Sequence, residues 1–240
     1  MTIWFTSDTH AGHPLVSVMR GFISDYYMKY DFDRILAEQG IEAAREHVKR
    51  TASRKHLAMA DIADVEAHDA CIIDNINSLV SEDDELFMLG DIAFRATPEY
   101  VLSYLDSIHC KHKHMIIGNH DYNYYDRADD DIYENRFETI DNSRRVKLII
   151  NGKQSDVNLS HFPYVEQLAG PGGNDKSRFA DAALHDDGRF LLFGHTHSSL
   201  KHNANSHCLH VGLDAWDLKP VSEKQVDEWF SAPVNDRAER

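Results

Sequence analysis

A short stretch near the N-terminus decides the fold: Ile3-Trp4-Phe5-Thr6-Ser7 followed by Asp8-Thr9-His10. β-branched and aromatic residues dominate its first part, which predicts a strand from Ile3 to Ser7. The Asp8 carboxylate and the His10 imidazole come directly after this strand. Polar side chains at the carboxyl ends of strands are typical of ligand sites in layered α/β folds. We therefore predict that this strand delivers Asp8 and His10 into a functional site.

The same arrangement recurs further along the chain. Short apolar runs predict strands over 85–89, 114–117, 154–160 and 190–193. Polar motifs follow these runs directly: Gly90-Asp91, Gly118-Asn119-His120-Asp121, His161 and Gly194-His195-Thr196-His197. Each motif says little alone, because Gly-Asp and Gly-Asn are common in turns. Together they predict that separate segments converge at one edge of a sheet.

Further elements complete a layered pattern. The sequence predicts helices over 64–80, 97–107 and 222–230, a hairpin over 145–160 and a strand over 208–211. Thr97-Pro98 is typical of an N-cap and first helical turn, and Asn151-Gly152 of a tight hairpin turn. Strands and helices alternate early and strands dominate later, which predicts an α/β fold with mixed β-sheets. We expect one domain over residues 1–240.

Residues 30–63 interrupt this alternation with a charged helical segment, predicted as an insertion within the domain. It carries a basic cluster: Arg45, Lys49, Arg50, Arg54 and Lys55. One interpretation is a solvated helix face balanced by nearby glutamates. The other is a lid that contacts an anionic substrate.

Composition excludes several classes of protein. The chain has 240 residues, of which 42% are hydrophobic, enough for a real core. No apolar run reaches the roughly 18 residues of a membrane-spanning helix, and the N-terminus carries no basic-then-apolar leader. The three cysteines lie far apart in the sequence, so we expect no disulfide framework. We therefore expect a cytoplasmic location.

The formal net charge of −15 argues against general nucleic-acid binding, because an acidic surface repels polyanions at long range. A compact positive site could still admit one phosphate group. Metal-binding carboxylates also contribute to this negative charge.

The donor types in the motifs favour transition metals. Imidazoles at His10, His161, His195 and His197 supply nitrogen, while Asp8, Asp91 and the Asn119 amide supply oxygen. This mixture suits Mn²⁺, Fe, Zn²⁺, Co²⁺ or Ni²⁺ better than Ca²⁺ or Mg²⁺ alone. Two metals about 3.5–4 Å apart need a bridging carboxylate. Asp91, alone after a glycine at a strand end, is the natural candidate.

Three further residues admit two interpretations each. Arg95 could contact phosphate or cover a helix start. His13 could line the pocket or cap a helix. Arg178, in a long polar loop, could contact phosphate or lie on the surface.

The ordered set of motifs resembles the calcineurin-like metallophosphoesterase superfamily, over residues 3 to about 221 apart from the insertion. Finer features resemble a small group of bacterial and phage phosphoesterases: Phe5 to His13, Leu159-Ser160-His161-Phe162-Pro163, Asp186-Asp187-Gly188-Arg189 and Val211 to Trp216. The resemblance implies mixed β-sheets flanked by helices in α-β-β-α layers. It also implies a dinuclear-metal-dependent phosphoester hydrolase.

The resemblance assigns roles residue by residue. It implies that Asp8, His10 and His197 hold one metal, that Asn119, His161 and His195 hold the second, and that Asp91 bridges both. A hydroxide between the metals, with Mn²⁺ the leading candidate, would attack phosphorus in line. His120 would stabilise the transition state or protonate the leaving oxygen, and Asp121 would orient His120. These roles agree with the general chemistry of metal-activated water and of proton donation by a carboxylate-paired imidazole.

The expected substrate is a small phosphoester, a phosphodiester or phosphomonoester, with nucleotides as plausible examples. The alternative is a non-catalytic metal-bound scaffold that binds a partner protein. Such a scaffold would usually lack a ligand or His120, and all of these residues are present. An acyl hydrolase is disfavoured, since no Gly-x-Ser-x-Gly elbow occurs. The sequence leaves the oligomeric state open.

Overall fold

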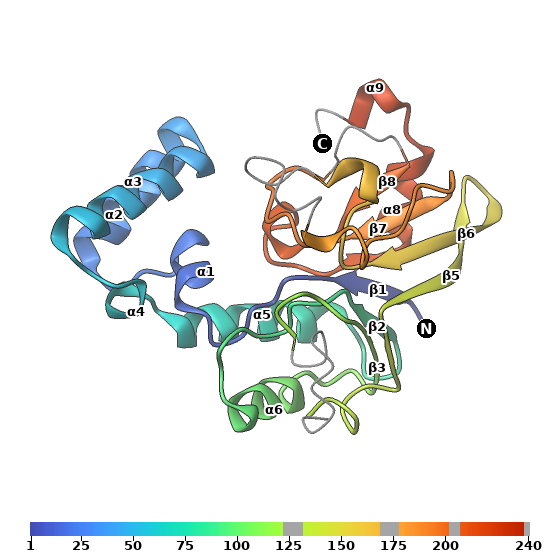
Figure 1. Cartoon of the computed structure of the whole chain (residues 1–240), viewed down its shortest axis with the longest axis horizontal. Coiled ribbons are helices and arrows are strands. Elements are labelled where there is room, and N and C mark those ends of the chain that lie inside the picture. The colour runs from blue at the N-terminus through green and yellow to red at the C-terminus, as the bar shows by residue number, and fades with distance from the viewer. Residues whose placement is uncertain (122–131, 169–177, 202–206, 238–240) are drawn as a thin grey trace.

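Two β-sheets form the centre of the protein in a computed structural model, which describes residues 1–121, 132–168, 178–201 and 207–237 (Figure 1). The first sheet has the order β4-β3-β2-β1-β9. Its strands are β1 (Ile3–Thr6), β2 (Glu85–Met88), β3 (His112–Ile116), β4 (Thr139–Asp141) and β9 (Val221–Ser222). The first four run parallel, and β9 pairs antiparallel with β1.

The second sheet has the order β5-β6-β7-β8. Its strands are β5 (Ser143–Ile150), β6 (Lys153–Ser160), β7 (Phe190–Phe193) and β8 (Cys208–His210). The hairpin of β5 and β6 is antiparallel, as its Asn151-Gly152 turn predicts, and β6, β7 and β8 are parallel. The prediction of mixed β-sheets flanked by helices is therefore confirmed.

Helices cover the first sheet on the face away from the second sheet. They are α5 (Val65–Leu79) and α6 (Pro98–Asp106). Asp64 caps α5 by accepting a hydrogen bond from the Ala67 amide, and Thr97 caps α6 through the Tyr100 amide. Leu86 and Met88 of β2 point into the core that these helices close. Alternation along β2 sends Phe87 to the opposite face.

The opposite face of the first sheet meets the second sheet. Phe5 and Phe87 from the first sheet pack in one cluster with Val157 and Leu192 from the second. The last regular helices are α8 (Glu223–Ser231) and α9 (Val234–Arg237). The predicted capping box of α8 is present, and Trp229 of α8 belongs to the core between the sheets. This shared core fixes the two sheets against each other, so the loops at their carboxyl ends have fixed relative positions.

A helical arm projects from the rest of the chain (Figure 1). After the short helix α1 (Pro14–Met19), it comprises α2 (Tyr26–Gln39), α3 (Ile41–Lys55) and α4 (Met59–Ile62). These helices occupy the region of the predicted insertion, but α2 already begins at Tyr26, where Asp25 caps it. The arm has its own hydrophobic core around Phe32 and Val48. In the described ranges, no helix is both long and apolar enough to cross a membrane.

Candidate metal centre

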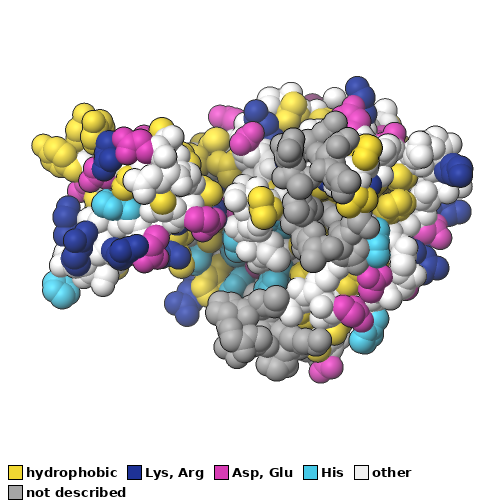
Figure 2. Space-filling view, turned by 90° about the horizontal axis from the view of Figure 1, so that it is seen from above, with side chains coloured by type: hydrophobic (Ala, Val, Ile, Leu, Met, Phe, Trp, Pro, Cys, Tyr) yellow, Lys and Arg dark blue, Asp and Glu magenta, His cyan; other side chains and the backbone are white. Residues whose placement is uncertain are grey.

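Every predicted motif lies in a loop that leaves the carboxyl end of a strand. Asp8 and His10 follow β1, Asp91 follows β2 and Asn119 follows β3, all from the first sheet. His161 follows β6 and the pair His195 and His197 follows β7, both from the second sheet. The two sheets therefore contribute to one site at their common edge. In the space-filling view, histidine side chains gather in the hollow between the arm and the main body (Figure 2).

Main-chain hydrogen bonds hold these loops together. The Asp8 amide donates to the Gly90 carbonyl at 3.0 Å, and the His10 amide donates to the Asp91 carbonyl at 3.0 Å. The Gly194 amide donates to the His161 carbonyl at 2.9 Å. The main chain therefore ties each of these strand ends to a neighbouring strand end, independently of the side chains.

The site is built on strained backbone. Asp8, His10, Asp91, His195 and His197 all adopt left-handed conformations, with φ of 61°, 48°, 54°, 69° and 49°. Such conformations are uncommon for residues other than glycine, and they cluster at functional sites.

Asp91 lies between two groups of donor atoms. Its Oδ2 atom is 3.5 Å from His10 Nε2 and also 3.5 Å from His161 Nε2. Its Oδ1 atom accepts a hydrogen bond from the His120 amide at 2.9 Å, which fixes the orientation of the carboxylate. On one side, His10 Nε2 faces His197 Nε2 at 3.0 Å. On the other, His161 Nε2 faces Asn119 Oδ1 at 3.1 Å.

These separations fit metal coordination. Two ligands about 2.1 Å from the same ion, at angles near 90–110°, lie roughly 3.0–3.5 Å apart. The described residues include two groups able to hold an ion: Asp8, His10 and His197, and Asp8, Asp91 and His161. Asp8 belongs to both groups, but both of its oxygens accept a hydrogen bond from the His195 amide, at 3.1 and 3.0 Å. The mixture of imidazole and carboxylate suits a borderline transition metal.

Hydrogen bonds on the far side of two of the imidazoles, those of His161 and His197, place a proton on Nδ1. His161 Nδ1 lies 2.8 Å from the Leu89 carbonyl, which can only accept. His197 Nδ1 lies 3.0 Å from the Asp214 carboxylate. Each Nδ1 therefore carries a proton, which leaves Nε2 as the ring atom that could bind a metal ion.

The electrostatics of the site favour a cation. Burial lowers the pKa of His161, but the charges of Asp91 and Asp8 raise it more, to about 9. Burial raises the pKa of Asp91, but His161 and His10 hold it well below its usual range. The carboxylates thus create a negative potential at His161 Nε2 that stabilises positive charge there.

His195 lies beside the second donor group. Its ring centroid is 5.2 Å from that of His161, and Phe162 and Phe179 contact the ring at 4.9 and 5.1 Å. These aromatic contacts hold the imidazole in place against His161. The structure therefore brings His195 into the same cluster as the other predicted ligands.

His120 stands at the mouth of the site. Its Nε2 atom is 4.0 Å from Asp91 Oδ2, and 34% of its side chain is exposed. Phe94 packs against the ring with centroids 4.2 Å apart. Burial lowers the pKa of His120, although the Asp91 carboxylate opposes this. His120 is therefore held close to Asp91 and can still reach a molecule that enters from solvent.

Asp121 has contacts that its predicted role did not anticipate. Its carboxylate accepts hydrogen bonds from the amides of Asp91 and Ile92, both at 2.8 Å, and from the Gly118 amide at 2.7 Å. Burial and the Asp91 carboxylate raise the pKa of Asp121 to about 7, against these donors. In the described part of the chain, Asp121 braces the main chain on both sides of the site and makes no hydrogen bond to the His120 ring.

The structure also places His13, Arg95 and Arg178, the three residues for which the sequence allowed two interpretations each. The His13 ring lies 5.6 Å from the His10 ring and 5.0 Å from Phe94, and its side chain does not cap α1. Arg95 lies over Phe94, and Arg178 lies over Phe179, at 5.0 and 4.9 Å from the ring centroids. His13 therefore lines the site, while both arginines rest on aromatic rings at its margin.

Sequence reasoning missed Asp214 and Arg20, which contact the predicted ligands on the side away from the proposed metals. Asp214 accepts a hydrogen bond from His197 Nδ1 at 3.0 Å and forms an ion pair with Arg20 at 2.7 Å. Arg20 also donates to the Asp8 carbonyl at 2.8 Å. Asp214 lies just beyond β8, so the pattern of polar residues after strands, extended to this strand, could have found it.

Gly118 allows a close approach that no side chain would permit. A Cβ atom at this position would collide with the amide nitrogen and carboxylate of Asp91. We expect Gly118→Ala to displace Asp91, to weaken metal binding and to lower the free energy of unfolding by about 1–3 kcal/mol. Metal titration and chemical denaturation would measure both effects.

Gly152→Ala is the matched control for this substitution. At that hairpin turn φ is 71° and an added methyl meets nothing within 4 Å. It should lower stability by about 1–2 kcal/mol and leave metal affinity unchanged. If Gly118→Ala bound metal as tightly as the wild type, metal binding would not depend on the close approach of Gly118 to Asp91.

Comparisons with known proteins agree with the fold and the site. The sequence model of the family described as calcineurin-like phosphoesterase matches residues 1–232. The chain therefore belongs to the calcineurin-like phosphoesterase family, whose members are metal-dependent enzymes that act on phosphoesters. The resemblance inferred from the motifs is confirmed.

The similar proteins include two from phages. The chain is 30% identical to the Gene 66 protein of Mycobacterium phage L5 over 224 residues, which cover 89% of this chain and 86% of that protein. It is 29% identical to the Gene 66 protein of Mycobacterium phage D29 over 234 residues, covering 92% of each. A crystal structure of a protein of unknown function from Aquifex aeolicus matches with a TM-score of 0.51 and 17% identity, over 95% of this chain and 98% of that one. That last likeness concerns the fold alone.

Proposed function

We propose that the chain is a dinuclear-metal-dependent phosphoester hydrolase. The position of Asp91 Oδ2, at 3.5 Å from both His10 Nε2 and His161 Nε2, is the observation that carries the proposal. A carboxylate oxygen placed between two donor groups is what a pair of bridged ions requires. Asp8 also touches both groups, but its hydrogen bonds to the His195 amide direct its oxygens toward that loop.

The ligands divide between two ions. Asp8, His10 and His197 would hold the first ion, Asn119, His161 and His195 the second, and Asp91 both. The His10–His197 separation of 3.0 Å and the His161–Asn119 separation of 3.1 Å support this division. We propose Mn²⁺ as the leading metal, since the set mixes nitrogen and oxygen donors and lacks thiolate.

The metal ions would supply an activated water and neutralise the charge that develops on phosphorus. Side chains of the protein would supply proton donation and hold the site in shape. His120, at the open side of the site, would donate a proton to the leaving oxygen. Asp121 would act indirectly, because its hydrogen bonds to the Asp91 and Gly118 amides keep the strand-end loops at a fixed separation.

A small phosphoester is the proposed substrate, with nucleotides among the candidates. The net charge of −15 disfavours a long polyanion, whereas a single phosphate group can approach the proposed metals. Preference for a monoester or a diester would depend on what contacts the second ester oxygen. His13 and Phe94 line the approach to His120 and are the first residues to consider.

Hydrolysis of nitrophenyl phosphate and bis-nitrophenyl phosphate would test the proposal. Chelated protein should be inactive, and addition of Mn²⁺ should restore turnover of at least one ester. A panel of mono-, di- and cyclic nucleotides would then identify the substrate class. Tight Mn²⁺ binding with no turnover of any ester in the panel would overturn the proposal and favour a non-catalytic role.

A further inference from the structure

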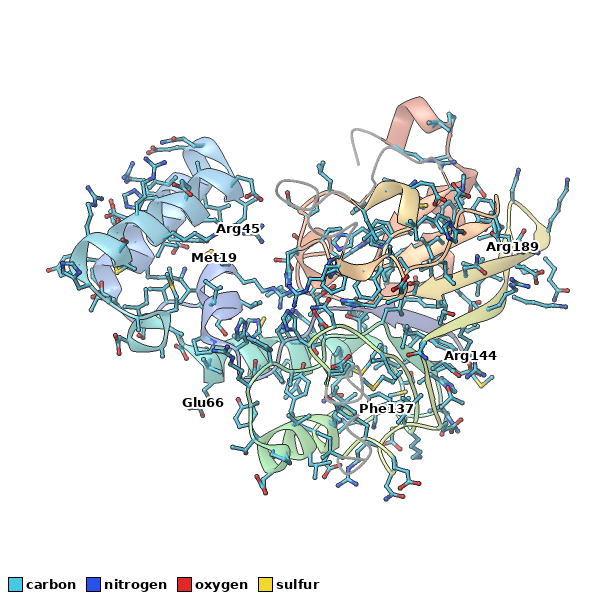
Figure 3. All side chains as sticks on the ribbon, in the orientation of Figure 1. Met19, Arg45, Glu66, Phe137, Arg144 and Arg189 are labelled. Carbon is cyan, nitrogen blue, oxygen red and sulfur yellow. The ribbon has the colours of Figure 1, made fainter. Side chains whose placement is uncertain are left out.

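Arg45 of the arm reaches the loop that carries a proposed metal ligand. On α3, Ala44 and Val48 face the core of the arm, while Arg45 extends toward the main body (Figure 3). Its Nε atom donates to the Met19 carbonyl at 3.1 Å, and its Nη1 atom donates to the His197 carbonyl at 3.2 Å. Only 11% of the side chain is exposed. Arg45 therefore belongs to a packed junction between the arm and the site.

Asp214 connects this arginine to the imidazole. Its Oδ1 atom pairs with Arg45 Nη2 at 2.6 Å, and its Oδ2 atom pairs with Arg20 at 2.7 Å. The same Oδ2 atom accepts a hydrogen bond from His197 Nδ1 at 3.0 Å. The Asp214 side chain is 2% exposed, so these contacts decide its orientation. Without Arg45, Asp214 would keep Arg20, whose Nε atom also donates to Oδ1 at 3.3 Å, but Oδ1 would lose its shortest contact. The loss of one of two cations from a buried carboxylate weakens the set of contacts that orients it.

The basic cluster of the arm thus divides into two parts. Arg50, for example, is 71% exposed and pairs with Glu46 on its own helix at 2.8 Å. This contact corresponds to the interpretation of a solvated helix face. Arg45 also pairs with a glutamate of its own helix, Glu42, at 3.0 Å. Its side chain is nevertheless largely buried, and its contacts to Asp214 and to the His197 carbonyl go beyond a solvated helix face.

Two main-chain segments form a stem that joins the arm to the rest of the chain. The Ser24 amide donates to the Ile62 carbonyl at 2.8 Å, and the Asp64 amide donates to the Phe22 carbonyl at 3.0 Å. Ile23 and Ala63 form an isolated antiparallel bridge between these bonds. Beyond this stem, the placement of α3 depends on the packing of Val18 from α1 into the core of the arm and on the contacts of Arg45.

We propose that Arg45 is a positioning residue that couples the helical arm to the metal centre through Asp214 and His197. Docking of α3 holds Asp214, which holds His197 with its Nε2 lone pair toward the site. By linkage, an ion bound at His197 stabilises the docked arm to the same extent that the docked arm strengthens binding of the ion. The inference rests on the proposed metal centre and adds that its affinity depends on the arm.

The test combines Mn²⁺ calorimetry with hydrogen exchange on the full chain. In the wild type, Mn²⁺ should slow amide exchange in α3. Arg45→Ala should weaken Mn²⁺ binding about 10–100-fold, as loss of a supporting contact does, and should remove the Mn²⁺-dependent protection of α3. Arg45→Lys, which keeps the charge but loses the forked geometry, should give an intermediate affinity.

Arg50→Ala is the matched control on the same helix and should leave both measurements at the wild-type values. Circular dichroism would establish that each variant is folded, and Arg45→Lys provides the test if Arg45→Ala is not. If a folded Arg45 variant bound Mn²⁺ with wild-type affinity, the coupling alone would be wrong. The same conclusion would follow if Mn²⁺ did not change amide exchange in α3 of the wild-type protein. A wild-type protein that binds no Mn²⁺ would overturn the metal centre and the coupling together.

Discussion

Asp91→Asn should lose most of its activity and at least one bound metal. The substitution keeps the shape of the side chain but removes the charge from the atom that lies 3.5 Å from both His10 and His161. We expect kcat to fall about 10³-fold, the equivalent of roughly 4 kcal/mol, because a bridged pair of ions stabilises several kcal/mol of developing charge. Steady-state kinetics and elemental analysis would measure both losses.

Asp83→Asn is a suitable control for Asp91→Asn. It removes the same charge from a side chain that is 87% exposed and whose ion pair with Lys111 is on the surface. Its metal content and rate should match the wild type. If Asp91→Asn retained both metals and the full rate, Asp91 could not be the bridge.

His120→Ala should be nearly inactive and yet fully loaded with metal. The imidazole is 4.0 Å from Asp91 and outside the two groups of donor atoms, so its removal spares the proposed ligands. Loss of a proton donor usually lowers kcat by about 10²–10⁴-fold. Burial lowers the pKa of His120, and the nearby Asp91 carboxylate opposes this.

The leaving group provides a second readout for His120→Ala. A nitrophenolate leaves without a proton more easily than an alkoxide, so the defect should be smaller for the nitrophenyl ester than for an alkyl ester. His185→Ala, at a histidine that is 81% exposed, should be kinetically silent. An equal defect for both esters would remove His120 from the role of proton donor.

Strand ends were the most informative part of the sequence. Asp8, Asp91 and His161 each follow a buried strand, and alternation or apolar runs make those strands recognisable from the amino-acid sequence alone. Some of the short elements were missed. β9 has only Val221–Ser222, too short to show alternation, and α1 has only Pro14–Met19, less than two helical turns, too short to show a helical period.

Contacts between distant residues lay beyond sequence reasoning. Arg20, Arg45 and Asp214 meet only because the arm, α1 and the loop after β8 fold together. In the sequence, Arg45 looks like one more member of a basic helix face. The contacts of Asp121 were equally hidden, because they involve backbone amides at Gly118 and Asp91. Pairing of this kind depends on register and packing, which a single sequence does not display.

The backbone conformations explain why the motifs contain glycine beside polar residues. Gly90 has a φ of 86° and precedes Asp91, whose φ is 54°. Two successive left-handed residues turn the chain sharply at the strand end, and an added Cβ at Gly90 would press on Gly118 and His161. The glycines therefore let the strand-end loops approach closely enough to bring the proposed metal ligands together.

The most direct test of the metal pair is electron paramagnetic resonance of the wild-type protein as it is titrated with Mn²⁺. Two Mn²⁺ ions bridged by one carboxylate are magnetically coupled, so occupancy of both sites should replace the hyperfine spectrum of an isolated ion by that of a coupled pair. We predict the coupled spectrum at two equivalents of Mn²⁺ and its absence in Asp91→Asn. A wild-type protein that showed only isolated Mn²⁺ at saturation would contradict the account.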